Sequence, residues 1–241
     1  MSSFSSLRRI PLTGFFILSA LLARPAQAQW AHGSTILLLV RDTVAYLATD
    51  SKLSTDRGAD DSGCKIICGE NKVVGLSGIL TARDLGFNLR DELTAALRAA
   101  PSDSIVTTLR SLQPRVAAVL RAGRTAKIVP DSLLAIGVVG CEFIGGEHVS
   151  TMVRYTVMRD GRPRFQSSLS MGNHLFCEGV TSAIEDRIPR SFGSHNPVAA
   201  LDSLMHLQVT TTPASVGGAT DVVSLTKHGI RWIRKKQNCP D

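Results

Sequence analysis

The sequence lacks most of the short motifs that identify common classes of enzyme. It has no Gly-x-Ser-x-Gly turn, which excludes the usual serine-hydrolase elbow, and no glycine-rich loop for phosphate. Its six histidines show no metal-ligand spacing. A basic cluster near the C-terminus comes without a nucleic-acid-binding motif, so we interpret it as a solvated strand end and tail. The sequence therefore predicts no cofactor, no metal and no nucleic-acid partner.

Long hydrophobic runs are also missing, apart from a short one near the start. Leu12–Leu22 follows Arg8 and Arg9 and precedes Ala26-Gln27-Ala28, the pattern of a secretory signal peptide with a small-residue cleavage site. The run is shorter than the roughly 20 residues of a membrane span. We therefore expect a signal peptide over residues 1–28, no stable membrane insertion, and a bacterial protein exported to the periplasm or the extracellular space.

The remaining chain, residues 29–241, is predicted to be one domain, because no repeat or low-complexity linker divides it. The signal peptide holds three arginines and no acid, so the net charge of +7 falls to +4 in this domain. Such a mild excess does not indicate a polyanionic partner.

Cysteine is scarce and odd in number for an exported chain. Two of the five cysteines, Cys64 and Cys68, lie four positions apart in a strand-like run, which separates them by roughly 13 Å at about 3.3 Å per residue. A disulfide needs Cα atoms within about 7 Å, so these two cannot bond to each other. Each would have to reach Cys141, Cys177 or Cys239, and the connectivity stays open. A zinc site is the weaker alternative, because no close cysteine or histidine pair supports it.

The segment Gly33–Gly78 carries the most information. Two strand-like runs, Ile36–Val40 and Val44–Leu47, flank a turn at Arg41-Asp42, and two more, at Lys65–Ile67 and Lys72–Leu76, flank Gly69-Glu70-Asn71. This pattern predicts two β-hairpins whose strands are buried on both faces, because apolar and polar residues do not alternate along them. Helical spacing follows in two segments, around Leu85–Leu97 and from an Asp103 cap to Gly123, with a kink expected at Pro114.

In the second half of the chain, predicted strands are again followed by predicted helices. Strands are predicted over Leu133–Phe143, Val149–Met158 and on to about Ser168. Two weaker helices are predicted at Val180–Ile188 and Val198–Gln208, and then a last hairpin, Ala219–Leu225 with Ile230–Arg234. This order fits an α+β fold in which two stacked antiparallel sheets have helices outside.

The Gly33-Ser34-Thr35 opening, Asp50 at the end of the second strand and Lys65 at the start of the third together resemble the proteasome subunit family, which belongs to the N-terminal-nucleophile hydrolases. The resemblance implies a four-layer αββα sandwich over the whole domain. In the β-type pattern the nucleophile follows a Gly and the key Asp lies sixteen residues later. Counting back from Asp50 lands on Ser34, directly after Gly33.

The resemblance implies catalytic positions at Ser34, Thr35, Asp50 and Lys65, with Ser34 as nucleophile and Thr35 beside it. The base in this class is the free α-amine of the nucleophile itself, so Gly33–Ser34 has to be cleaved first. Lys65 would tune that amine and Asp50 would hold Lys65. The backbone near Ser77-Gly78 is implied as the oxyanion donor. The expected substrates are peptides or small amides, and self-association is implied because family members stack into rings.

Several positions depart from the catalytic pattern. Pro213 and Val216 stand where the β-type pattern has an Asp and a Ser before its Gly-Gly pair, here Gly217-Gly218, and Ser215 is one place off. Met171-Gly172-Asn173 stands where the family has a Ser-bearing Gly turn, with His174 next to it. The stretch from Ser77 to Arg83 is as similar to the non-catalytic α-type subunits as to the catalytic ones. A catalytically silent scaffold for binding or assembly is therefore the alternative function, and the sequence leaves enzymatic activity open.

Overall fold

The computed structural model describes residues 30–55, 58–127, 134–158, 160–187, 196–237 and 239. Within these residues the chain forms two antiparallel sheets and three α-helices, which confirms the predicted α+β class. The predicted signal peptide, residues 1–28, lies outside the described residues. No helix in the described part is long and apolar enough to cross a membrane.

The larger sheet has the order β11-β10-β9-β7-β1-β4-β5, and β6 and β8 also pair with β7. Its strands are β1 (Trp30–Gly33), β4 (Leu53–Thr55), β5 (Gly58–Asp60), β6 (Ile66–Cys68), β7 (Lys72–Ala82), β8 (Phe87–Asn88), β9 (Leu134–Ile144), β10 (Glu147–Val157) and β11 (Pro163–Met171). The smaller sheet has the order β12-β2-β3-β13-β14. Its strands are β2 (Thr35–Arg41), β3 (Val44–Thr49), β12 (His174–Gly179), β13 (Asp221–Thr226) and β14 (Gly229–Arg234).

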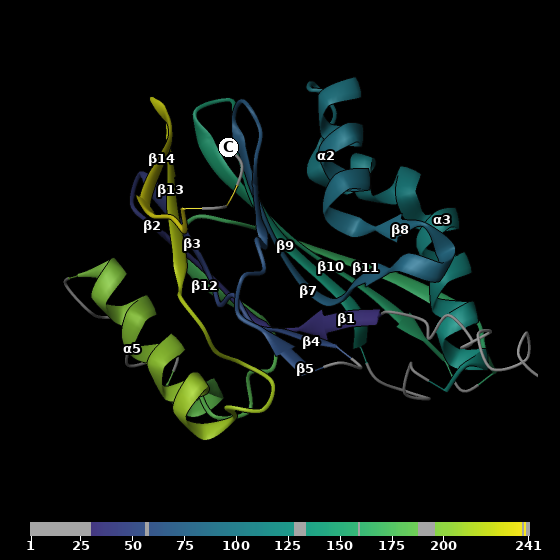
Figure 1. Ribbon diagram of the computed structural model, residues 1–241. Coiled ribbons are helices and arrows are strands. Elements are labelled where there is room, and N and C mark those ends of the chain that lie inside the picture. Colours follow the sequence, from purple (N-terminus) through teal and green to yellow (C-terminus); the bar gives the residue numbers. More distant parts are fainter. Residues whose placement is uncertain are drawn as a thin grey trace, which may run out of the picture.

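The two sheets pack face to face, and helices cover their outer faces (Figure 1). Strand β2 shows why its sequence is a continuous apolar run. Ile36, Leu38 and Val40 pack in the core between the sheets, whereas Leu37 and Leu39 pack against α5 (Pro197–Thr211). A strand buried on both faces has no polar positions to alternate with. The predicted β2–β3 hairpin is present, with Asp42 in the left-handed region (φ 55°) at its turn.

The sheets approach each other closely at Gly75 in β7. A Cβ at this position would lie 2.8 Å from Cγ2 of Ile36, so no larger residue fits without a shift of β2. The predicted pairing of the third and fourth strands is also present, because β6 pairs with β7. Strand β7, however, extends through Gly78 to Ala82, beyond the predicted end.

Helices α2 (Leu89–Ala99) and α3 (Ile105–Thr125) cover the outer face of the larger sheet. Ser104, not the predicted Asp103, caps α3, and its hydroxyl accepts the Thr107 N–H. Ser104 directly precedes the first buried apolar residue, Ile105, which fixes where the helix begins. The helix continues through Pro114 and ends at Thr125, two residues beyond the predicted stop.

The predicted helix near Val198–Gln208 is present as α5, with Asn196 as its N-cap. The predicted helix at Val180–Ile188 is wrong in its described part. Strand β12 ends at Gly179, and a turn leads into a short 3-10 helix, η3 (Glu185–Arg187). Val180 donates its N–H to the Ser34 carbonyl at 2.9 Å, which keeps the chain extended there. The sequence analysis also missed β12 itself, β1 and the short β4–β5 hairpin.

One disulfide links distant parts of the chain. Cys64 bonds to Cys239 with 5.5 Å between their Cα atoms. This confirms the prediction that Cys64 and Cys68 do not bond to each other. Cys68, Cys141 and Cys177 form no disulfide among the described residues. The bond fixes the C-terminal tail beside Lys65, the residue that follows Cys64.

Candidate active site

The Asp50 carboxylate lies at the end of β3 and is completely buried. One oxygen, Oδ1, accepts the Thr35 N–H and the Lys65 ammonium, each at 3.1 Å. The other oxygen, Oδ2, accepts the Gly217 N–H at 3.1 Å and the Lys52 N–H at 3.2 Å. Four donors therefore surround one carboxylate, which fixes its position and satisfies both oxygens.

The Lys65 side chain lies directly before β6 and is also fully buried. Its ammonium contacts Asp50 Oδ1 and donates to the Lys52 carbonyl at 2.5 Å. Burial lowers the pKa of Lys65 to about 8, although the neighbouring Asp50 carboxylate raises it. An ammonium has three donors, so one N–H remains without a partner among the described residues.

Ser34 connects β1 to β2 and is 2% exposed. Its φ of 133° is a conformation that non-glycine residues rarely adopt. The Ser34 carbonyl accepts the Val180 N–H, and a Cβ at Gly179 would lie 1.9 Å from that oxygen, so only glycine fits there. The Ser34 hydroxyl oxygen is buried and has no hydrogen-bond partner within the described residues. The hydroxyls of Thr49 and Ser51, on either side of Asp50, are also buried without a partner among the described residues, so Ser34 is one of three uncommitted hydroxyls in this region.

Thr35 differs from Ser34 in this respect. Its hydroxyl donates to the Val180 carbonyl at 2.5 Å, and its backbone N–H is one of the donors to Asp50. The structure thus brings Thr35, Asp50 and Lys65 into direct contact through one carboxylate. Ser34 joins this group through its peptide bond to Thr35.

Met171-Gly172-Asn173 and His174, which depart from the catalytic pattern, lie away from Ser34. Residue His174 begins β12 and pairs with Val40, whereas Gly179 at the other end of the strand pairs with Thr35. Because β12 runs antiparallel to β2, Met171-Gly172-Asn173 and His174 lie at the far end of the sheet from Ser34. The glycine next to Ser34 is instead Gly179, which contacts the Ser34 carbonyl.

Sequence reasoning missed a partly buried ion pair near the start of β2, in which Glu178 is buried and Arg154 is exposed. Glu178, 2% exposed, accepts from Arg154 Nε at 2.7 Å. A Cβ at Gly137 would lie 2.6 Å both from Glu178 Cγ and from the Ser77 hydroxyl, so these groups are closely packed. An acidic residue between Cys177 and Gly179 in an otherwise apolar strand is the only sequence signal for this pair.

The Gly217-Gly218 pair has a structural role at the site. The Gly217 N–H donates to Asp50, and the Gly217 carbonyl accepts the N–H groups of Ser51 and Lys52. Val216 is buried in the core against α5, and the Pro213 carbonyl accepts from the Lys52 ammonium. Neither Pro213 nor Val216 supplies a side chain that could donate or accept a proton.

No family model and no curated protein matches this chain.

Proposed function

We propose that the protein is an exported hydrolase of peptide or other amide bonds that uses Ser34 as an N-terminal nucleophile. The observation that carries the proposal is the buried Asp50–Lys65 ion pair, joined through the Thr35 N–H to the residue that bears an uncommitted hydroxyl. A buried pair of this kind costs desolvation energy, so its location beside a candidate nucleophile favours a role in chemistry.

The arrangement of layers supports a proteasome-like αββα sandwich. Two antiparallel sheets have their shared core at β2, β7 and β9, and helices lie outside both. The Cys64–Cys239 disulfide supports an oxidising compartment, the periplasm or the extracellular space.

The position of strand β1 supports the proposal that the substrate is an extended peptide. This strand lies between β7 and β4 and pairs with both, through Gly33–Gly78 on one side and His32–Ser54 on the other. Cleavage at Gly33–Ser34 would free this segment, and the edges of β7 and β4 could then accept another extended chain by strand addition. The segment ahead of Ser34 thus occupies the place proposed for a substrate.

The chemistry would proceed in two stages. The Ser34 hydroxyl first attacks the Gly33 carbonyl, the C–N bond breaks as the amine takes the hydroxyl proton, and water hydrolyses the resulting ester. The freed amine, which has a pKa of about 8 in model peptides, then serves as base when Ser34 attacks a substrate amide. The Lys65 ammonium nearby would favour the neutral amine.

A catalytically silent scaffold is the second candidate, and one observation favours it. Pro213 and Val216 provide no polar group to orient an amine. Self-association through the family's ring-forming surfaces belongs to this candidate as well as to the enzyme.

Intact mass of the protein recovered from its exported fraction distinguishes the two. An active enzyme should begin at Ser34, and Ser34→Ala should stop both the trimming and any amidase activity. Ser34→Cys should retain trimming, because a thiol can replace the hydroxyl. Thr35→Ala is the matched control, which should still be trimmed because the Thr35 hydroxyl is engaged with Val180. A single species beginning at Gln29 in both the wild type and Ser34→Ala would refute the enzyme.

A further inference from the structure

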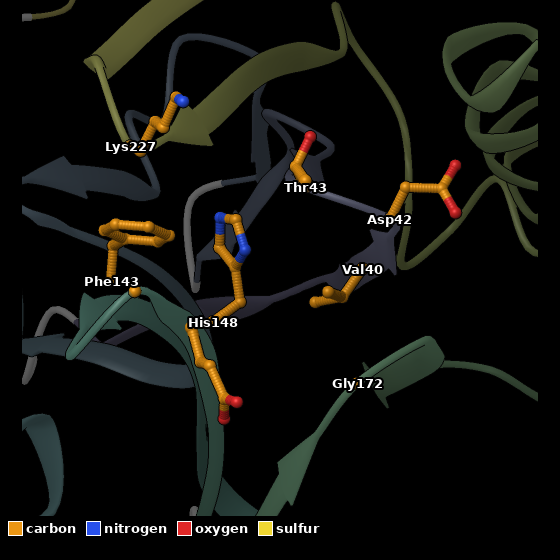
Figure 2. A pocket seen from close by; sticks show the side chains of 9 residues that line it. Val40, Asp42, Thr43, Phe143, His148, Gly172 and Lys227 are labelled. Atoms are coloured by element: carbon orange, nitrogen blue, oxygen red, sulfur yellow. The ribbon is translucent and has the colours of Figure 1, made fainter.

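A cavity lies at the opposite end of the sheets from Ser34. Its volume is about 290 Å³, and the turns between β2 and β3, β9 and β10, and β13 and β14 surround it together with Gly172 (Figure 2). Strand β2 separates the two places, and its seven residues span roughly 20 Å at about 3.3 Å each. The cavity is therefore independent of the candidate active site.

His148 is the most constrained polar group in this cavity. Its side chain is 5% exposed, its Nε2 lies 2.9 Å from the Leu225 carbonyl, and its ring meets the edge of Phe143 at 5.0 Å between centroids. A carbonyl only accepts, so Nε2 carries the hydrogen and Nδ1 of the neutral ring is an acceptor. Nδ1 has no partner among the described residues, so the cavity offers a lone pair to a ligand that donates.

The other lining groups define the rest of the ligand. Lys227 and Thr43 stand on the turns above His148 and are exposed donors whose polar ends point away from the His148 ring in Figure 2. Rotation of these side chains toward the ring would let them bind a carboxylate. Val40 and Phe143 provide an apolar surface beneath them. The Asp42 carboxylate points away from His148 in Figure 2, is 78% exposed and is paired with Arg41, so it does not fill the cavity.

We propose that this cavity binds a free apolar α-amino acid. The carboxylate contacts Lys227 and the Thr43 hydroxyl, the ammonium donates to His148 Nδ1, and the side chain packs on Val40 and Phe143. Asp42 is paired with Arg41 at 3.9 Å, and Glu147 balances Lys227 at the rim, so the charges around the cavity cancel, which suits a zwitterion. The size of the cavity, near the lower limit of ligand pockets, suits one amino acid and not a long peptide.

Titration of the isotope-labelled protein with leucine, followed by NMR of the backbone amides, tests the proposal. Leucine should shift the amides of Thr43, Gly146, Gly172 and Lys227 in a saturable way. Leucinamide lacks the carboxylate and 4-methylpentanoate lacks the ammonium, so each should bind about tenfold or more weakly. Ser34→Ala should bind leucine like the wild type, which separates this site from the proposed hydrolase.

Two surface variants provide a matched pair that does not disturb the fold. Lys227→Gln should weaken leucine binding by about tenfold, whereas Lys127→Gln, at an exposed position after α3, should leave it unchanged. Absence of saturable shifts, equal binding of leucinamide, or an equal effect of both lysine variants would overturn the site. Equal binding of 2-hydroxy-4-methylpentanoate would overturn the assignment to amino acids, because a neutral donor would then suffice.

Discussion

At the level of single residues, the ionisation of Lys65 is the property most open to measurement. Its folded pKa of about 8 lies below the value of about 10.4 for an exposed lysine. Between these values the folded protein has released a proton that the unfolded chain still holds. The contribution of Lys65 to the free energy of unfolding therefore rises with pH across this window and is constant below it.

Lysine-selective NMR should show one side chain that titrates near pH 8. Lys65→Met should remove that signal and assign it. A Lys65 midpoint above 10 would contradict the prediction, because it would mean that the attraction of Asp50 outweighs desolvation.

Asp50 provides a second prediction at this scale. Asp50→Asn keeps the shape of the side chain but replaces one acceptor by an amide that faces N–H donors, and it leaves Lys65 without its counter-charge. Breaking a buried ion pair in this way costs about 3–5 kcal/mol. Urea unfolding should show this loss, whereas the control Asp42→Asn, on an exposed turn, should have no measurable effect. Equal stability of both variants would mean that Lys65 is neutral in the fold.

At the level of elements, β1 should protect its two neighbours. A chain that begins at Ser34 lacks β1, so the facing edges of β7 and β4 lose their backbone partner. Hydrogen exchange at Leu53–Thr55 and Gly78–Ala82 should then be faster than in the untrimmed Ser34→Ala variant. Exchange in β13, which pairs with β3 and β14, serves as the internal control. Unchanged exchange at β4 would show that the gap between β7 and β4 closes when β1 is absent, so that no substrate could bind there.

The same elements show what the sequence could predict. The β2–β3 hairpin was predictable because its apolar runs and turn are local signals, whereas the Asp50–Lys65 contact was expected only from the family resemblance. Strand β12 was missed because His174–Gly179 gains its stability from pairing with β2, more than 130 positions earlier. Val180 and Ile184 have helical spacing, yet the bond from Val180 to Ser34 holds that segment extended. Non-local pairing of this kind leaves no periodic pattern in the sequence.

At the level of the whole molecule, the Cys64–Cys239 bond connects the C-terminal tail to the candidate active site. The tail is held there by further contacts, because Lys236 forms an ion pair with buried Asp221 at 3.0 Å and donates to the Gly63 carbonyl. Gly63 in turn donates to the Ser51 carbonyl at 2.9 Å, next to Asp50. The disulfide thus constrains both the chain as a whole and the segment that positions Lys65.

Removal of this bond should therefore have a global and a local effect. The closed loop spans 175 residues, and loss of a native disulfide typically lowers stability by about 2–5 kcal/mol. Cys64→Ser with Cys239→Ser should lower the unfolding midpoint accordingly and should speed hydrogen exchange at Gly63–Ile66 under native conditions. Cys177→Ser, outside any described disulfide, should change neither exchange at those residues nor the midpoint by a comparable amount. If the double variant unfolds earlier but exchange at Gly63–Ile66 stays slow, the Lys236–Asp221 pair alone suffices to hold the tail, and the disulfide acts only through the unfolded chain.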